Sequence, residues 1–245
     1  MPEGPLLVMW KEQVQEFIGK KVTGVETTTK LDAERMNGKT ITDITTWGKH
    51  FLISFDNFTL RTHFLMFGDL FINNRKPPEK PIKLRLYFDD AELNFYSCAM
   101  RFIDEPLDNV YDWSADLMNE TWNAEAAKQK LKVIPDTLIC DALLDQTIFS
   151  GLGNIIKNEV LFRMKVHPES KVGKIPAQLW NAVINESVIY CWQFFEWKKD
   201  NSLRKHWEAH RQKVCPRDDV KFEKQYTGEL QRQSFFCTTC QNLYV

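Results

Sequence analysis

The stretch Leu-Leu-Asp-Gln-Thr-Ile-Phe-Ser-Gly-Leu-Gly-Asn, residues 143–154, decides the fold of the second half of this chain. Apolar residues recur at helical spacing on both sides of its end, over residues 137–149 and 154–164. Gly151 and Gly153 interrupt the pattern, and closely spaced glycines permit a tight turn between two helices. The stretch therefore predicts a helical hairpin with a glycine turn.

The first half of the chain follows a different pattern. Apolar positions predict an N-terminal helix over residues 6–17, with Gly19 just past its end. Short β-branched and aromatic segments then alternate with turn residues, which is typical of antiparallel strands. These segments are residues 21–29, 40–47, 50–55, 58–64, 70–73, 82–88 and 92–96. Helical periods follow over residues 124–131, 137–149, 154–164, 176–197 and 204–211. Together with these helices, the strands predict an α+β fold whose β-domain comes first.

Composition excludes several classes of protein. The 245 residues are 43% hydrophobic and 27% charged, which is typical of a globular protein and not of a disordered or fibrous one. The net charge of -1 argues against binding nucleic acid by bulk charge and permits only a concentrated basic site. No apolar run reaches the 18 or so residues of a membrane span. We expect a cytoplasmic protein that does not enter membranes.

Cysteines are concentrated near the C-terminus, at positions 215, 237 and 240. Clustered cysteines in a cytosolic chain indicate a metal site better than a disulfide framework. Residues 221–226 and 229–236 flank Thr227 and Gly228 as a predicted β-hairpin. Two alternatives stay open: a metal-free hairpin held by its aromatic residues Phe222, Tyr226, Phe235 and Phe236, and His210 as a less favoured fourth ligand.

The sequence begins Met-Pro-Glu-Gly-Pro. Aminopeptidases remove a methionine that precedes a small residue, and this would expose the secondary amine of Pro2. Part of such an amine is neutral at physiological pH and can attack an electrophilic carbon, with Glu3 placed to move protons. The plain alternative is that Pro2 is only a tolerated second residue.

Four regions together resemble the formamidopyrimidine-DNA glycosylase and endonuclease VIII family of base-excision repair enzymes. They are the Pro-Glu-Gly-Pro start, the segment Trp47–Leu52, the stretch 143–154 and the C-terminal cysteine cluster. The resemblance implies an N-terminal helix with an antiparallel β-sandwich, a helical helix-two-turn-helix domain and a C-terminal zinc-finger-like β-hairpin. We place these three domains at residues 1–115, 116–212 and 213–245.

The resemblance also implies roles for single residues. Pro2 would be the nucleophile, Glu3 the proton shuttle, and Lys49 an essential lysine on a hairpin. Asn154 would cap a helix and bind a phosphate, and the hairpin tip would present Arg232 to another phosphate. His63 matches a phosphate-contacting histidine, and Met66 matches the side chain that fills the space of an extruded nucleotide. Leu65 and Phe67 beside Met66 resemble the endonuclease VIII branch, and Cys215, Asp218, Cys237 and Cys240 match the zinc ligands.

Some positions depart from the family pattern. Leu6 stands where a second glutamate is common, Cys140 where a lysine is common, and Asp218 where the second zinc ligand is normally cysteine. The segment Tyr96–Phe102 also lacks the arginine-rich loop of members that excise 8-oxoguanine. This difference favours oxidised pyrimidines or ring-opened purines as substrates.

The resemblance implies a bifunctional DNA glycosylase and apurinic/apyrimidinic lyase that forms a Schiff base through Pro2 and proceeds by β,δ-elimination. Damaged double-stranded DNA would be its partner, with structural zinc, no catalytic cofactor and no obligate protein partner. We expect a monomer that reaches the nucleoid through DNA. The leading alternative is a damaged-DNA binding protein of the same fold that no longer cuts, and a zinc-ribbon protein that binds RNA is a distant third.

Overall fold

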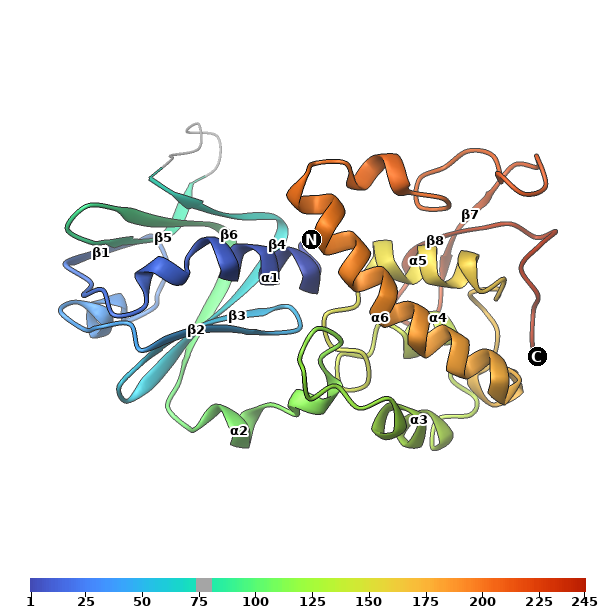
Figure 1. The fold of residues 1–245 in the computed structure, drawn as a ribbon, viewed down its shortest axis with the longest axis horizontal. Coiled ribbons are helices and arrows are strands. Elements are labelled where there is room, and N and C mark those ends of the chain that lie inside the picture. The colour runs from blue at the N-terminus through green and yellow to red at the C-terminus, as the bar shows by residue number, and fades with distance from the viewer. Residues whose placement is uncertain (74–80) are drawn as a thin grey trace. The chain divides into compact units, whose positions relative to one another are not determined.

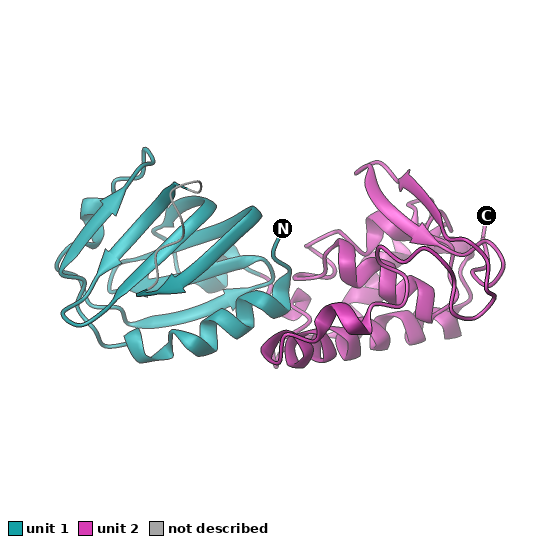
Figure 2. Cartoon of the chain, turned by 90° about the horizontal axis from the view of Figure 1, so that it is seen from above, with its two compact units in different colours: residues 1–111 teal, residues 112–245 magenta. Residues whose placement is uncertain are grey.

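A computed structural model describes residues 1–73 and 81–245. The chain forms two compact units, Met1–Tyr111 and Asp112–Val245 (Figure 2). The C-terminal hairpin belongs to the second unit, and the division into three domains stays a prediction. No helix within the described residues is long and apolar enough to cross a membrane.

The first unit begins with helix α1, Gly4–Gln13. Pro5 lies in its first turn, where a missing N–H costs no helical hydrogen bond. The side chains of Leu7 and Trp10 lie on one face of the helix and are buried in the core of the unit. A short 3-10 turn, η1 (Gln15–Phe17), extends the predicted helix, and Gly19 follows at a φ of 84°.

Six antiparallel strands form the sheet of this unit in the order β1-β5-β6-β4-β3-β2 (Figure 1). β4 is longer than the sequence predicts, because it runs through both the segment 58–64 and the segment 70–73. The strands are β1 (Gly24–Thr27), β2 (Asp43–Trp47), β3 (His50–Phe55), β4 (Phe58–Ile72), β5 (Ile82–Tyr87) and β6 (Glu92–Ile103). Short helical segments η2 (Ala33–Met36) and α2 (Leu107–Val110) complete the unit.

An irregularity in the long strands β4 and β6 divides the sheet into two parts. The pairing of β4 with β6 shifts between Phe64 and Asp69. Before this shift β4 also pairs with β3, whereas β5 pairs only with the first part of β6. Side chains from both parts, such as Phe51 and Leu84, enter one core with α1. The unit is therefore the predicted antiparallel β-sandwich with an N-terminal helix.

The second unit is helical, as predicted, and carries a C-terminal β-hairpin. The predicted helix over 137–149 is wrong beyond Ala142, since Asp145 accepts a hydrogen bond from the Thr147 backbone and begins a turn. Its helical segments are η3 (Trp113–Ala115), α3 (Ala124–Lys132), α4 (Ile139–Ala142), α5 (Asn154–Arg163), η4 (Val172–Lys174), α6 (Ala177–Lys199) and η5 (Leu203–His206). The hairpin strands are β7 (Glu223–Thr227) and β8 (Arg232–Phe236).

Candidate active site and metal centre

Pro2 and Glu3 lie immediately before helix α1 and are both buried. Glu3 is only 4% exposed, and its backbone carbonyl accepts a hydrogen bond from the N–H of Leu6 at 2.9 Å. The N-terminal end of a helix carries a partial positive charge, which favours an acidic side chain beside it. The start of the chain is therefore held in place by the helix that follows it.

Lys49 lies in the two-residue turn between strands β2 and β3. Gly48 supplies the positive φ of 52° that the first position of a type II′ hairpin turn needs. The Lys49 side chain is 8% exposed, and its backbone carbonyl lies 3.2 Å from Nδ1 of His63. The fold therefore brings together two of the predicted site residues, Lys49 and His63, from adjacent strands.

Leu65, Met66 and Phe67 occupy the irregular segment of β4 and point away from the core. Their exposed fractions are 46%, 59% and 70%, although all three are large apolar side chains. Phe67 adopts a left-handed φ of 63°, which is strained for an aromatic residue. A Cβ at Gly68 would approach the Ser97 carbonyl oxygen to 2.7 Å, so this position requires glycine. The backbone here is built to expose three consecutive apolar side chains.

In the second unit, Asn154 is the first residue of α5, and Gly153 takes the N-cap position. The expectation that Asn154 caps this helix is wrong, because its side chain turns to the hairpin: Nδ2 donates to the Gln233 carbonyl at 2.9 Å. Its Oδ1 is buried and has no hydrogen-bond partner in the part of the chain that the structure describes. This contact places Asn154 beside Arg232, the residue that precedes Gln233.

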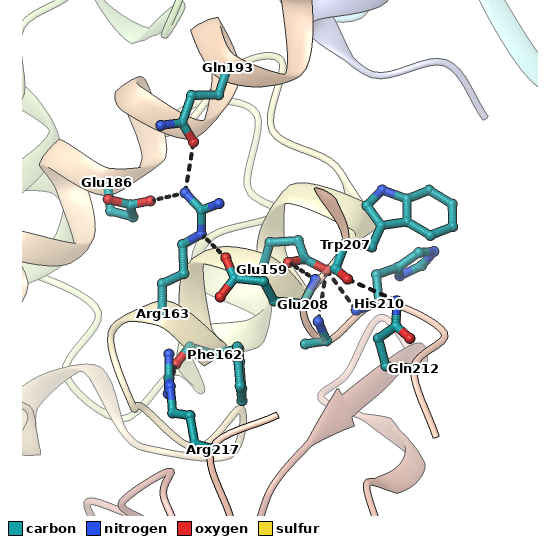
Figure 3. Close-up of polar contacts among 11 residues, drawn as sticks. Glu159, Phe162, Arg163, Glu186, Gln193, Trp207, Glu208, His210, Gln212 and Arg217 are labelled. Carbon is teal, nitrogen blue, oxygen red and sulfur yellow. Dashed lines mark hydrogen bonds and ion pairs between the residues drawn. The ribbon is translucent and has the colours of Figure 1, made fainter. Parts of the chain in front are cut away.

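Glu159 anchors the segment that leads from η5 to the hairpin. Its fully buried carboxylate accepts hydrogen bonds from the backbone N–H groups of Glu208, Ala209 and His210, at 2.9, 3.1 and 2.6 Å (Figure 3). These bonds explain why the predicted helix over 204–211 forms only as η5, since its N–H groups are used by Glu159. Burial raises the pKa of Glu159, and the three backbone hydrogen bonds oppose this rise.

Arg163, one helical turn after Glu159, joins α5 to α6 and to the same segment. Its guanidinium contacts Glu186 at 2.8 Å and Glu208 at 2.7 Å (Figure 3). Arg217 stacks on the ring of Phe162 and donates to the Phe162 backbone carbonyl at 2.8 Å. Helix α5 thus fixes both ends of the segment that precedes the hairpin.

Asp141 on α4 holds the turn of the hairpin. Its carboxylate accepts hydrogen bonds from the backbone N–H groups of Glu229 at 2.8 Å and Leu230 at 3.3 Å. A Cβ at Gly228 would lie 2.3 Å from this carboxylate, so the close approach requires glycine. The predicted turn at Thr227 and Gly228 is in fact the four residues 228–231, and Arg232 begins β8 directly after it.

Cys215, Asp218, Cys237 and Cys240 converge below the hairpin, with their ligand atoms within 4.8 Å of one another. Cys215 Sγ lies 3.9 Å from Cys240 Sγ, and Asp218 Oδ2 lies 3.4 Å from Cys215 Sγ and 3.2 Å from Cys237 Sγ. A zinc tetrahedron with 2.3 Å bonds to sulfur has edges of about 3.8 Å between sulfurs and about 3.5 Å to oxygen. The donor set and its spacing therefore fit a metal ion.

The geometry decides one of the two alternatives for this region, the role of His210. His210 is not part of the cluster, because its ring is buried against Phe235 and its Nδ1 lies 3.2 Å from Asn158 Nδ2. Phe222, Phe235 and Phe236 are buried as expected for a hairpin with an aromatic core, whereas Tyr226 is 66% exposed.

Hydrogen bonds from the thiols of Cys240 and Cys237 lower the pKa of Asp218.

Two positioning residues, Glu159 and Asp141, are not among the site residues predicted from the sequence. Glu159 had a detectable signal, since it lies between the apolar residues Ile156 and Val160 of a helix, where a charge needs a buried partner. Asp141 had no such signal, because its partners are backbone groups 88 and 89 residues away.

Comparison with protein families adds a separate line of evidence. A model described as the formamidopyrimidine-DNA glycosylase N-terminal domain matches residues 1–104, and one described as the formamidopyrimidine-DNA glycosylase H2TH domain matches residues 114–189. The chain belongs to the formamidopyrimidine-DNA glycosylase and endonuclease VIII family. The family that the sequence motifs suggest is therefore confirmed, and so is the predicted α+β fold class.

Between a quarter and a third of the aligned residues are identical in this chain and its curated relatives. It is 27% identical to endonuclease 8-like 3 of Xenopus laevis, over 86% of this chain and 36% of the relative. It is 30% identical to endonuclease 8-like 2 of Bos taurus, over 74% of this chain and 58% of the relative. The chain thus spans only part of these relatives. A formamidopyrimidine-DNA glycosylase of Oceanobacillus iheyensis is 29% identical over 73% of this chain and 71% of the relative.

Solved structures have the same fold as this family member. A viral DNA glycosylase aligns with a TM-score of 0.84 and 20% identity over 98% of this chain and 100% of the other. The Lactococcus lactis formamidopyrimidine-DNA glycosylase, bound noncovalently to DNA that contains an AP site, aligns with a TM-score of 0.86 and 22% identity over 98% and 99% of the two chains.

Proposed function

We propose that this protein is a bifunctional DNA glycosylase and AP lyase that removes oxidised bases from double-stranded DNA. The observation that carries the proposal is the retention of Pro2 and Glu3, both buried directly ahead of α1, in the segment that the family's N-terminal domain model matches. A secondary amine beside a carboxylate is the pair that iminium chemistry on a sugar requires.

The reaction begins when removal of Met1 has exposed the Pro2 amine. Its nitrogen lone pair forms a bond to C1′ of the damaged nucleotide while the glycosidic bond breaks and the base leaves with a proton. The attached amine then loses its proton, and the C1′–O4′ bond breaks as O4′ takes up a proton, which opens the sugar ring and leaves a cationic iminium. This iminium draws electrons from the sugar, so loss of a C2′ proton breaks the C3′–O bond and a later proton loss breaks the C5′–O bond. Water then releases Pro2. Glu3 moves protons in these steps.

Phosphate groups are held by residues from both units. Lys49 and His63 serve in the first unit, and Asn154 and Arg232 in the second. Lysine and arginine bind phosphate through charge-assisted hydrogen bonds, and the N-terminus of α5 adds the partial positive charge of a helix end beside Asn154. These contacts position the sugar and carry no base specificity.

Leu65, Met66 and Phe67 fill the space that the extruded nucleotide leaves. A base must leave the stack before its C1′ becomes accessible, and an apolar wedge compensates part of the lost stacking. Their exposure and strained backbone support this role.

Oxidised pyrimidines and ring-opened purines are the proposed substrates. The segment Tyr96–Phe102, where the family resemblance places an arginine-rich loop, lies within strand β6, and Phe102 packs on the core of the unit. Arg101 is the only arginine of this segment, which supports a preference for these substrates over 8-oxoguanine. A structural relative from Lactococcus lactis, with a TM-score of 0.86, was solved with DNA that contains an oxidised pyrimidine.

Cys215, Asp218, Cys237 and Cys240 are the proposed ligands of one structural zinc ion. Bound there, zinc would play a structural role, because its four ligands come from the segments on either side of the hairpin that carries Arg232. Leu6 packs on the core of the first unit, so no second carboxylate accompanies Glu3 at that position. We expect the protein to act as a monomer on genomic DNA.

A lesion panel under single-turnover conditions tests the proposed function. Duplexes that carry thymine glycol, a ring-opened purine, 8-oxoguanine or an abasic site are mixed with protein confirmed to begin at Pro2. We expect base release from the first two and incision that leaves phosphate at both DNA ends. Tight binding of damaged DNA without base release or incision would instead establish the non-catalytic damaged-DNA binding protein.

A further inference from the structure

One face of the sheet in the first unit gathers positive charge. In the strand registers, His50 lies opposite His63 and Leu52 lies opposite Arg61, while Arg61 in turn lies opposite Arg101. Side chains two apart along a strand share a face, so His50, Arg61, His63 and Arg101 all lie on one face of β3, β4 and β6. The opposite face carries Phe51, Leu60 and Phe102, which pack in the core. We name these four residues the cationic cluster.

The pairing of Arg61 with Arg101 is unfavourable in the protein alone. Like charges placed directly opposite one another destabilise an antiparallel pair. Within residues 1–73 and 81–245, neither arginine forms an ion pair with a carboxylate, and Nε of Arg61 is buried with no hydrogen-bond partner. Burial and the neighbouring Arg101 lower the pKa of Arg61. The cluster thus presents donors and charge that lack a matching anion.

Aromatic side chains fix the geometry of the cluster. Nδ1 of His50 lies 3.1 Å from the Tyr111 hydroxyl, and the rings of Trp47 and Tyr111 lie 4.9 Å apart. Burial and the charge of Arg61 lower the pKa of His50 to about 3, so this imidazole is neutral at physiological pH. Arg61, Arg101 and Lys49 therefore supply the positive charge of this face, and the His50 ring contributes a neutral polar surface.

We propose that the cationic cluster, through Arg61 and Arg101, binds a further backbone phosphate of the DNA strand, next to the phosphate held by Lys49 and His63. The chemistry of arginine and the position of the cluster both point to this ligand. The guanidinium fork matches two oxygens of a phosphate, and the cluster adjoins the Lys49 carbonyl through His63, 3.2 Å away. This inference rests on the proposed function only in naming DNA as the source of the phosphate.

The test compares Arg61→Met with wild-type protein in two measurements. The first is the salt dependence of affinity for a duplex with a non-cleavable abasic-site analogue. Loss of one phosphate contact should reduce the slope of log K against log salt concentration by about 1 and weaken binding about tenfold at low salt. The second is thermal unfolding without DNA, where removing a half-buried charge that faces Arg101 should raise Tm by about 2–4 °C.

Lys39→Met is the matched control, since Lys39 is an exposed lysine of the same unit and its loss changes the net charge by the same amount. It should leave the salt slope and Tm unchanged, and Arg61→Lys should retain most of the slope. An Arg61→Met variant with an unchanged slope, or with a lower Tm, overturns the inference. Borohydride trapping at saturating DNA separates this failure from that of the proposed function: trapping with an unchanged slope removes only the inferred contact.

Discussion

The C-terminal cluster that we propose as a zinc site differs from a four-cysteine site by a single residue, Asp218. Carboxylate oxygen is a harder donor than thiolate and binds zinc more weakly. The carboxylate is already within 3.4 Å of two cysteine sulfurs, so the site needs no rearrangement to use it. The ligand identity therefore sets the affinity of the site more than its shape does.

Asp218→Cys should bind zinc at least tenfold more tightly than wild type, and Asp218→Ala should bind it more weakly, because the fourth donor becomes softer or is lost. Competition with a chromophoric chelator measures both affinities. The control is Asp219→Ala, which changes an adjacent acidic residue outside the cluster. Equal zinc affinity in all variants would show that residue 218 is not a ligand.

His210 makes the second unit sensitive to acid. Burial, followed by the charges of Arg211 and Lys157, lowers its pKa to about 4. Below pH 6.5 the unfolded chain binds a proton here that the folded chain does not, so stability is full above pH 6.5 and is lost as the pH falls toward 4. The expected contribution of this residue is about 2 kcal/mol.

Unfolding by urea at pH 7.5 and 4.5 tests this contribution in wild type and His210→Gln. The variant keeps an acceptor for Asn158 and removes the imidazole, so its loss of stability between the two pH values should be smaller by about 2 kcal/mol. The same loss in both proteins would mean that His210 titrates alike when folded and unfolded.

Among the elements, the irregular segment of β4 holds Leu65, Met66 and Phe67 with their side chains exposed to solvent. The three side chains are exposed, so their removal costs little packing energy in the free protein. Their value lies in duplex DNA, where extruding a nucleotide costs a few kcal/mol.

Met66→Ala should lower the single-turnover excision rate from duplex DNA about tenfold, equivalent to about 1.4 kcal/mol. Its rate on the same lesion in single-stranded DNA should change little, since no stacked pair must be opened. Val133→Ala shortens another exposed apolar side chain, in the second unit, and serves as the control. Equal losses on both substrates would argue against a wedge.

The β-hairpin depends on α4 for the position of its turn. Asp141 holds the backbone at Glu229 and Leu230, three and two residues before Arg232. If this contact serves to aim Arg232 at a phosphate, the effects of the two residues on DNA affinity must be coupled.

A double-mutant cycle measures that coupling. Arg232→Ala should weaken DNA binding about tenfold, Asp141→Ala should weaken it several-fold, and the double variant should resemble Arg232→Ala. Circular dichroism and zinc content confirm that each variant is folded. Strictly additive effects would show that Asp141 does not act through Arg232.

For the whole molecule, sequence patterns predicted the parts that depend on local order. Periodicity predicts the strand 50–55 and the helices that begin near 124, 154 and 177. Cysteine spacing indicates the cluster of Cys215, Cys237 and Cys240, and the family resemblance adds Asp218 to it. The exposure of Leu65 to Phe67 is harder to see, because a run of apolar residues is typical of a core strand.

Contacts between distant segments could not be predicted in this way. The prediction of a helix over residues 204–211 was wrong because the carboxylate of Glu159, about 50 residues earlier, accepts hydrogen bonds from backbone N–H groups of this segment. Asn154 was predicted to cap a helix, but its side chain contacts the hairpin instead. This contact is equally remote, since its partner Gln233 lies 79 residues away. Arg61 and Arg101 became opposed only through the strand register. Tertiary partners, which local propensity does not encode, decide each of these positions.

The central claim is that the Pro2 nitrogen forms a covalent iminium with deoxyribose. Borohydride reduction during reaction with abasic-site DNA, followed by proteolysis and mass spectrometry of the DNA-linked peptide, tests it directly. We predict one DNA adduct per protein, located on Pro2 of protein that lacks Met1, and none when Met1 is retained. An adduct on a lysine such as Lys49, or no adduct from folded protein that begins at Pro2 and binds the DNA, would contradict the account.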